Sequence, residues 1–83
     1  MNEFKSKLEG YLQKAKRLFE NLEDCDPGEL NMPKLRKEFR DMAVGYYSDA
    51  LHFHAKGEYA NALAALEYAE GWLDAGKKLG IFK

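Results

Sequence analysis

Apolar residues recur at steps of three and four along most of this chain, and that spacing marks one face of an α-helix. The pattern is interrupted at residues 23–33, which contain both prolines and several turn-forming residues, and again at Lys56-Gly57. The spacing therefore predicts helices over residues 3–24, 33–55 and 58–79. The apolar tail Ile81-Phe82 is expected to fold back onto them.

Helices of similar length joined by short connections pack most simply as an antiparallel bundle. A chain of 83 residues has room for one domain with one core. Pairing the second and third helices about Gly57 places Tyr46 opposite Ala69, so that a large side chain meets a small one. We predict an all-α fold for residues 1–83, an antiparallel three-helix bundle whose last two helices form a close hairpin.

The predicted hairpin has the spacing of a known helical repeat. The string Gly57-x-Tyr59-x-x-Ala62-x-x-x-Leu66-x-x-Ala69 resembles the second half of a tetratricopeptide unit. Stacked repeats of this kind need about three units to be stable, and this chain holds a single one. We therefore expect a tetratricopeptide-like hairpin rather than a repeat protein.

A closer resemblance covers Tyr46–Gly80. The strings YYSDALHFHAKGEYANALAALEYA and YAEGWLDAGKKLGIF look like the archaeal family catalogued as domain of unknown function 357, and GWLDAG is their most specific part. Members of that family are small all-helical proteins without an assigned activity. The resemblance implies a helical bundle, an archaeal origin and a cytoplasmic location. The positions that carry it are Tyr47, Asp49, His52, Phe53, Gly57, Tyr59, Ala62, Tyr68, Ala69 and residues 71–76.

The charge balance argues against a polyanionic partner. The chain carries 13 basic and 14 acidic residues, with a net charge of −1 and a pI near 6.1. Basic residues do cluster around the first break, but acidic residues are interleaved with them and cancel much of their field. These basic residues are Lys14, Lys16, Arg17, Lys34, Arg36, Lys37 and Arg40. A nucleic-acid accessory protein is therefore only a third hypothesis.

Two further features bear on location. Cys25 is the only cysteine, so the chain forms no internal disulfide, and a free thiol suits a reducing compartment. The first residues lack the apolar core of a signal peptide, and no apolar run is long enough to cross a bilayer. We predict a cytoplasmic protein with no membrane anchor.

Carboxylates and imidazoles on the last two helices form one candidate site. Asp49 and His52 lie one turn apart, and Glu67, Glu70 and Asp74 share a strip of the third helix, an arrangement used by helical metal sites. A di-metal carboxylate site needs a Glu and two Glu-x-x-His pairs spread over four helices. The chain has only two histidines, so a dimer would have to complete such a site. Binding of a metal or small ligand at these residues is the alternative hypothesis, and no cofactor is expected.

Two aspartates of the last two helices, Asp49 and Asp74, lie at the edges of apolar stripes. An aspartate there usually accepts a hydrogen bond, and Tyr59, Tyr68 and Trp72 are the candidate donors. No serine or cysteine nucleophile lies beside a recognisable base, so we do not expect an enzyme.

The apolar faces of the last two helices are too broad for each other alone. The shoulders carry Tyr47 on the second helix and Tyr68, Trp72 and Leu79 on the third. If the first helix covers both shoulders, these residues are core; if it covers one, the other is left as an interface, most simply with an identical subunit. The leading hypothesis is a non-enzymatic protein–protein interaction module that forms a homodimer through these four residues or binds another protein.

Overall fold

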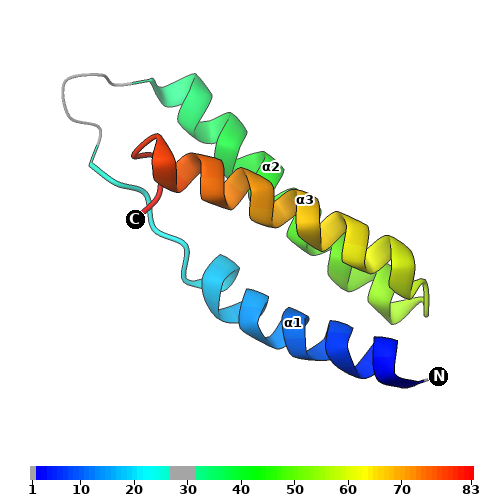
Figure 1. The fold of residues 1–83 in the computed structure, drawn as a ribbon. Coiled ribbons are helices and arrows are strands. Elements are labelled where there is room, and N and C mark those ends of the chain that lie inside the picture. Colours follow the sequence, from blue (N-terminus) through cyan, green and yellow to red (C-terminus); the bar gives the residue numbers. More distant parts are fainter. Residues whose placement is uncertain (1, 27–31) are drawn as a thin grey trace.

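The computed structural model describes residues 2–26 and 32–83. Three helices follow one another along the chain: α1 (Asn2–Glu20), α2 (Pro33–Ala55) and α3 (Tyr59–Lys78) (Figure 1). The all-α bundle predicted from the spacing of apolar residues is confirmed, and α2 has the predicted bounds. The first helix ends earlier than predicted, because the residues that follow it pair with the C-terminal tail instead.

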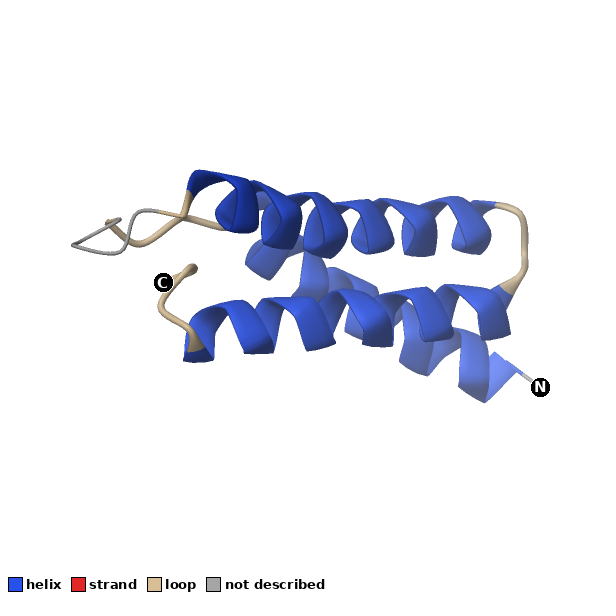
Figure 2. Cartoon of the chain, turned by 90° about the horizontal axis from the view of Figure 1, so that it is seen from above, coloured by secondary structure: helices blue, strands red, loops and turns tan. Residues whose placement is uncertain are grey.

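The hairpin of α2 and α3 is held together by small residues. Ala43 and Ala50 of α2 and Ala62 and Ala69 of α3 have no exposed surface. Because these side chains are so small, the two helices run side by side in close contact along their length (Figure 2). The alanine-rich sequence of α3 is therefore explained by packing within the chain.

Helix α1 lies on one side of this hairpin (Figures 1 and 2). Its buried stripe contains Leu8, Leu12, Ala15 and Phe19. The Phe19 ring stacks on Tyr47 of α2, with ring centroids 4.9 Å apart and planes inclined by 9°. One flank of α2 is therefore covered by α1, and the other flank faces away from it.

A glycine in the left-handed conformation follows the C-cap residue of both α2 and α3. Gly57 has φ of 79° and Gly80 has φ of 76°, a region that side-chain-bearing residues rarely adopt. After α3, the Ile81 N–H donates to the Gly76 carbonyl at 2.8 Å and the Gly80 N–H donates to the Lys77 carbonyl at 3.1 Å. These two bonds form a Schellman motif, which turns the chain back across the end of α3.

The predicted return of the tail is confirmed, and it ties three parts of the chain together. Ile81 and Phe82 are buried. Asp24 and Phe82 form an antiparallel bridge, in which the Cys25 N–H donates to the Ile81 carbonyl at 2.8 Å and the Lys83 N–H donates to the Glu23 carbonyl at 3.0 Å. The tail therefore fixes the segment that leaves α1 against the end of α3.

Gly76 makes room for the tail. A Cβ atom at this position would overlap the ring of Phe82, which is itself buried. We expect Gly76→Ala to destabilise the chain by about 1–2 kcal/mol, because overpacking typically costs about 1–3 kcal/mol and alanine regains up to about 1 kcal/mol of helix propensity. Urea unfolding followed by circular dichroism measures the difference. In the Phe82→Ala background the same change is expected to be neutral or stabilising; an equal loss in both backgrounds would refute the overlap.

Candidate functional site

Four aromatic residues lie together on the flank of the hairpin that faces away from α1. The Tyr46 ring of α2 stacks on Tyr68 of α3 at 5.2 Å between centroids. One to two turns away, Phe39 and Trp72 pack edge to face, with their ring centroids 5.0 Å apart. We call these four residues the aromatic face. No described element of the chain lies over it, and in Figure 2 the hairpin is seen with α1 behind it.

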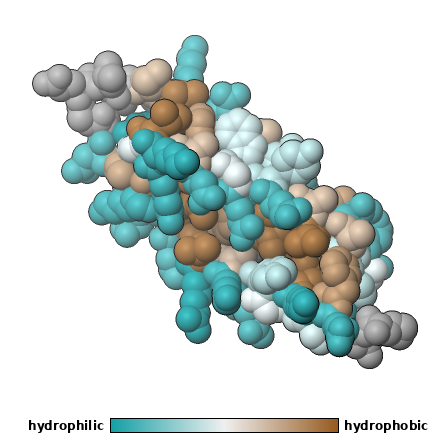
Figure 3. Space-filling model, in the orientation of Figure 1, coloured by the Kyte–Doolittle hydropathy of each residue, from teal (hydrophilic) through white to brown (hydrophobic). Residues whose placement is uncertain are grey.

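The aromatic face leaves large apolar groups in water. Tyr68 is 62% exposed and Leu79 is 63% exposed, while Trp72 is half-buried. Leu79 follows the same side of α3 and lines a hollow with Met32 and Leu35 at the end of the hairpin. Figure 3 shows hydrophobic surface near the start of α2 and the end of α3, and also along the junction of α3 with α1.

Beside the Tyr46–Tyr68 stack the surface is hollowed. A shallow pocket of about 340 Å³ lies between the two helices, and it is lined by Phe39, Glu67, Tyr68, Gly71, Trp72 and Ala75. Its lining is almost entirely apolar, and Glu67 supplies its one charged group. Ala60, Ala64, Gly71 and Ala75 succeed one another on this side of α3 at helical spacing, so small side chains make up much of it.

The structure separates the four residues predicted as interface. Tyr47 is 6% exposed and lies beneath α1, so it belongs to the core of the single chain. Tyr68, Trp72 and Leu79 lie on the flank that α1 leaves open. Sequence reasoning did not single out Phe39, and it expected Tyr46 to pack opposite Ala69 within the hairpin; both residues lie on the side of α2 toward α3 and contact its aromatic residues.

The carboxylates and imidazoles of the candidate metal site do not come together. Within residues 2–26 and 32–83 there is no group of three or more His, Cys, Asp or Glu side chains placed to hold a metal ion. Asp49, His52, Glu67 and Asp74 are exposed. Glu70 is half-buried, and burial raises the pKa of its carboxyl, with a further rise from the charges of Asp74 and Glu67.

Among the described residues, no hydrogen bond joins Asp49 or Asp74 to the expected donors. Both side chains are exposed, so water satisfies their carboxylates and neither needs a donor from Tyr59, Tyr68 or Trp72. His54 does have a partner within the bundle: its Nε2 lies 2.8 Å from Oε2 of Glu9, which links α1 to α2.

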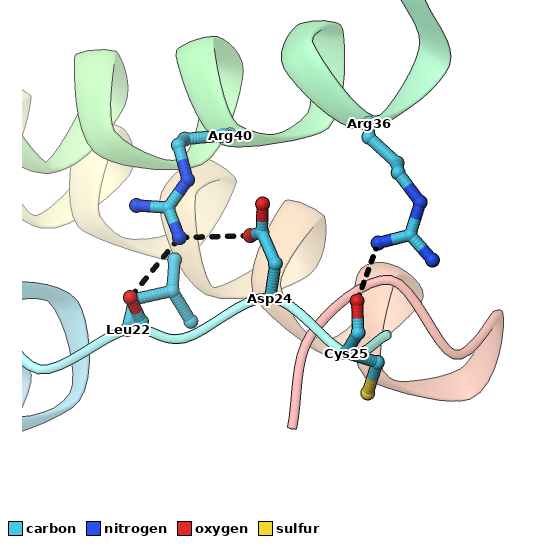
Figure 4. A network of polar contacts seen from close by, with 5 residues as sticks. All are labelled: Leu22, Asp24, Cys25, Arg36 and Arg40. Atoms are coloured by element: carbon cyan, nitrogen blue, oxygen red, sulfur yellow. Dashed lines mark hydrogen bonds and ion pairs between the residues drawn. The ribbon is translucent and has the colours of Figure 1, made fainter. Parts of the chain in front are cut away.

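Two of the clustered basic residues have structural partners instead of an open surface. Arg40 donates from Nη2 to the Leu22 carbonyl at 3.0 Å and to Oδ1 of Asp24 at 2.8 Å (Figure 4). Arg36 donates from Nη1 to the Cys25 carbonyl at 2.9 Å (Figure 4). Both guanidinium groups therefore attach the segment after α1 to α2, and less positive charge is free for phosphate.

In the described part of the chain, no helix combines the length and the apolar character that crossing a bilayer requires.

The fold and this surface define a small three-helix protein with an open aromatic face on its C-terminal hairpin. The chain belongs to the family described as "Protein of unknown function (DUF357)", whose model matches residues 10–82. The match extends well beyond the Tyr46–Gly80 region of the resemblance and includes most of α1 and the buried tail. Comparisons with curated proteins and with solved structures find no significant match.

Proposed function

We propose that this protein is a non-enzymatic protein–protein interaction module that self-associates through the aromatic face. The observation that carries the proposal is the exposure of Tyr68 beside a half-buried Trp72 on a flank that α1 leaves open. Tyrosine and tryptophan are the residue types enriched among the strongest contacts of protein interfaces. A partner that covers an aromatic surface removes apolar area from water, and this burial lowers the free energy of the complex.

A second copy is the occupant that this surface fits. The aromatic face carries a projecting ring, Tyr68, next to a hollow at Gly71, so it supplies both halves of a self-complementary contact. The charges are complementary as well. Glu58 precedes α3, whereas Lys77 and Lys78 lie in its last turn. Two copies whose α3 helices run in opposite directions therefore bring Glu58 of each copy toward the last-turn lysines of the other.

Small size favours the same conclusion. An 83-residue chain buries only about 60–65% of the surface that its unfolded form exposes, so burial of further apolar area by association contributes to its stability. We place this module in the reducing cytoplasm of an archaeal cell, with support from the free thiol of Cys25 and from the family resemblance.

Tyr68→Ser tests the proposal. We expect light scattering to show a concentration-dependent dimer for the unmodified chain and at least about tenfold weaker association for the variant. Truncating a hot-spot residue, a class in which tyrosine is enriched, costs about 2 kcal/mol or more, and about 1.4 kcal/mol corresponds to tenfold. Trp72→Ala is expected to act in the same direction.

Tyr11→Ser is the matched control, because Tyr11 of α1 is also exposed but lies away from the aromatic face. Its association should equal that of the unmodified chain. A chain that stays monomeric at every concentration would refute self-association. Equal weakening by Tyr11→Ser and Tyr68→Ser would refute the assignment to the aromatic face.

A further inference from the structure

Gly71 has no explanation within the single chain. It lies in the interior of α3, where glycine costs about 1 kcal/mol relative to alanine. A Cβ atom built on it would meet no described atom within 4 Å, so no neighbouring helix requires the missing side chain. Gly76 of the same helix differs, because the Phe82 ring occupies its open side. The space over Gly71 is therefore free for an atom from outside the chain.

The hollow over Gly71 has the chemistry of a tyrosine site. Its lining includes Phe39, Trp72 and Ala75, which suit an aromatic ring, and Glu67, whose carboxylate is of a type that accepts a hydrogen bond from a phenol hydroxyl. Tyrosine presents this combination of an apolar ring and a polar tip. Gly45 of α2 also has open space above it, but its hollow contains the two carboxylates of Asp41 and Asp49 and is less suited to a ring.

We propose that two copies of the chain meet with their α3 helices antiparallel, and that Tyr68 of each copy occupies the hollow over Gly71 of the other. This inference rests on the proposed self-association and specifies its geometry. Tyr68 and Gly71 are one turn apart on the same side of α3, so a two-fold axis between them exchanges ring and hollow and makes each contact twice. The small side chains of Ala64 and Ala75 allow the two helices to approach closely.

Charge selects the antiparallel orientation. The Glu58 carboxylate, one residue before α3 begins, accepts a hydrogen bond from the Asn61 amide at 3.0 Å. Antiparallel packing brings this carboxylate toward Lys78 of the other copy and opposes the two helix dipoles. Parallel packing would bring the lysines of the two copies together, and like charges repel.

Gly71→Leu tests the inference. In the single chain the leucine meets open space and improves helix propensity, so helicity and urea stability of the dilute monomer should be unchanged or higher. Because the leucine fills the hollow, we expect the dimer dissociation constant, measured by sedimentation over a dilution series, to rise at least about tenfold. Gly10→Leu is the matched control: it places the same side chain at an exposed, open glycine of α1, and it should leave association unchanged.

The outcomes separate this inference from the proposed function. If the unmodified chain associates, Tyr68→Ser weakens it and Gly71→Leu does not, the aromatic face stands and the ring-in-hollow contact is refuted. If the unmodified chain never associates, both are refuted. If Gly71→Leu and Gly10→Leu weaken association equally, the contact at Gly71 is refuted as well.

Charge exchange tests the orientation. Glu58→Lys and Lys78→Glu should each weaken association a few-fold, because each places two like-charged pairs in the dimer. An equimolar mixture of the two variants should recover association, since every Glu58–Lys78 contact in the mixed dimer again joins opposite charges. If the mixture associates no better than either variant alone, the antiparallel orientation is refuted.

Discussion

Phe82→Ala is expected to destabilise the folded chain by about 3–5 kcal/mol, the range found when a buried aromatic ring is truncated. Phe82 is 2% exposed although it lies next to the end of the chain. Its ring packs over Gly76, and the Arg40 guanidinium lies 5.9 Å from the ring centroid. Removing it leaves a cavity where α2, α3 and the segment after α1 meet. Since a chain of this size is stable by only about 4–12 kcal/mol, much of the total would be lost.

Urea unfolding monitored by circular dichroism measures this loss. Phe4→Ala is the matched control, because it removes the same ring from a position that is 44% exposed, and it should cost about 1 kcal/mol or less. A change in the urea midpoint with an unchanged slope would show that stability itself is altered. Similar losses for the two variants would contradict the buried position of the tail.

Leu8→Ala is expected to cost about 2–5 kcal/mol, because Leu8 is 1% exposed and lies in the core that α1 shares with the hairpin. The loss tests whether α1 is a full member of the core. Helix α1 is attached by this stripe, by the Phe19–Tyr47 stack and by the contact of Glu9 with His54. A cavity at Leu8 weakens the N-terminal half of that attachment.

Leu18→Ala gives the comparison on the same helix. Leu18 is 44% exposed, so the same substitution should cost about 1 kcal/mol or less. Both variants are measured by urea unfolding at a concentration where the chain is monomeric. If Leu8→Ala were as mild as Leu18→Ala, α1 would not be packed as the structure describes.

The family match covers the segments that the C-terminal tail holds together. The match begins at residue 10 and ends at residue 82, so it includes both the end of α1 and the Phe82 that holds it. The GWLDAG string lies within the matched range and contains Gly71, Trp72 and Gly76 of α3. Gly76 serves the tail, and Gly71 and Trp72 line the hollow of the aromatic face.

Much of the fold could be predicted from local chemistry. The spacing of apolar residues identified all three helices, because a buried face must repeat with the period of the helix. The break predicted at Lys56-Gly57 coincides with the end of α2, where Gly57 has a positive φ that few other residues adopt. Ala62 and Ala69 indicated a close hairpin, since only small side chains allow two helices to approach that closely. These features depend on neighbours a few residues away.

Only the tertiary structure determines which apolar shoulder α1 covers and which one stays exposed. Tyr47 and Tyr68 were both predicted on the apolar shoulders of the hairpin helices, yet Tyr47 lies beneath α1 and Tyr68 is in water. The difference depends on the side of the hairpin where α1 lies, and that side is fixed by contacts between distant residues: Phe19 with Tyr47, and Asp24 with Phe82. A helical stripe shows which apolar residues gain from burial, but the packing of the whole chain determines which of them are buried.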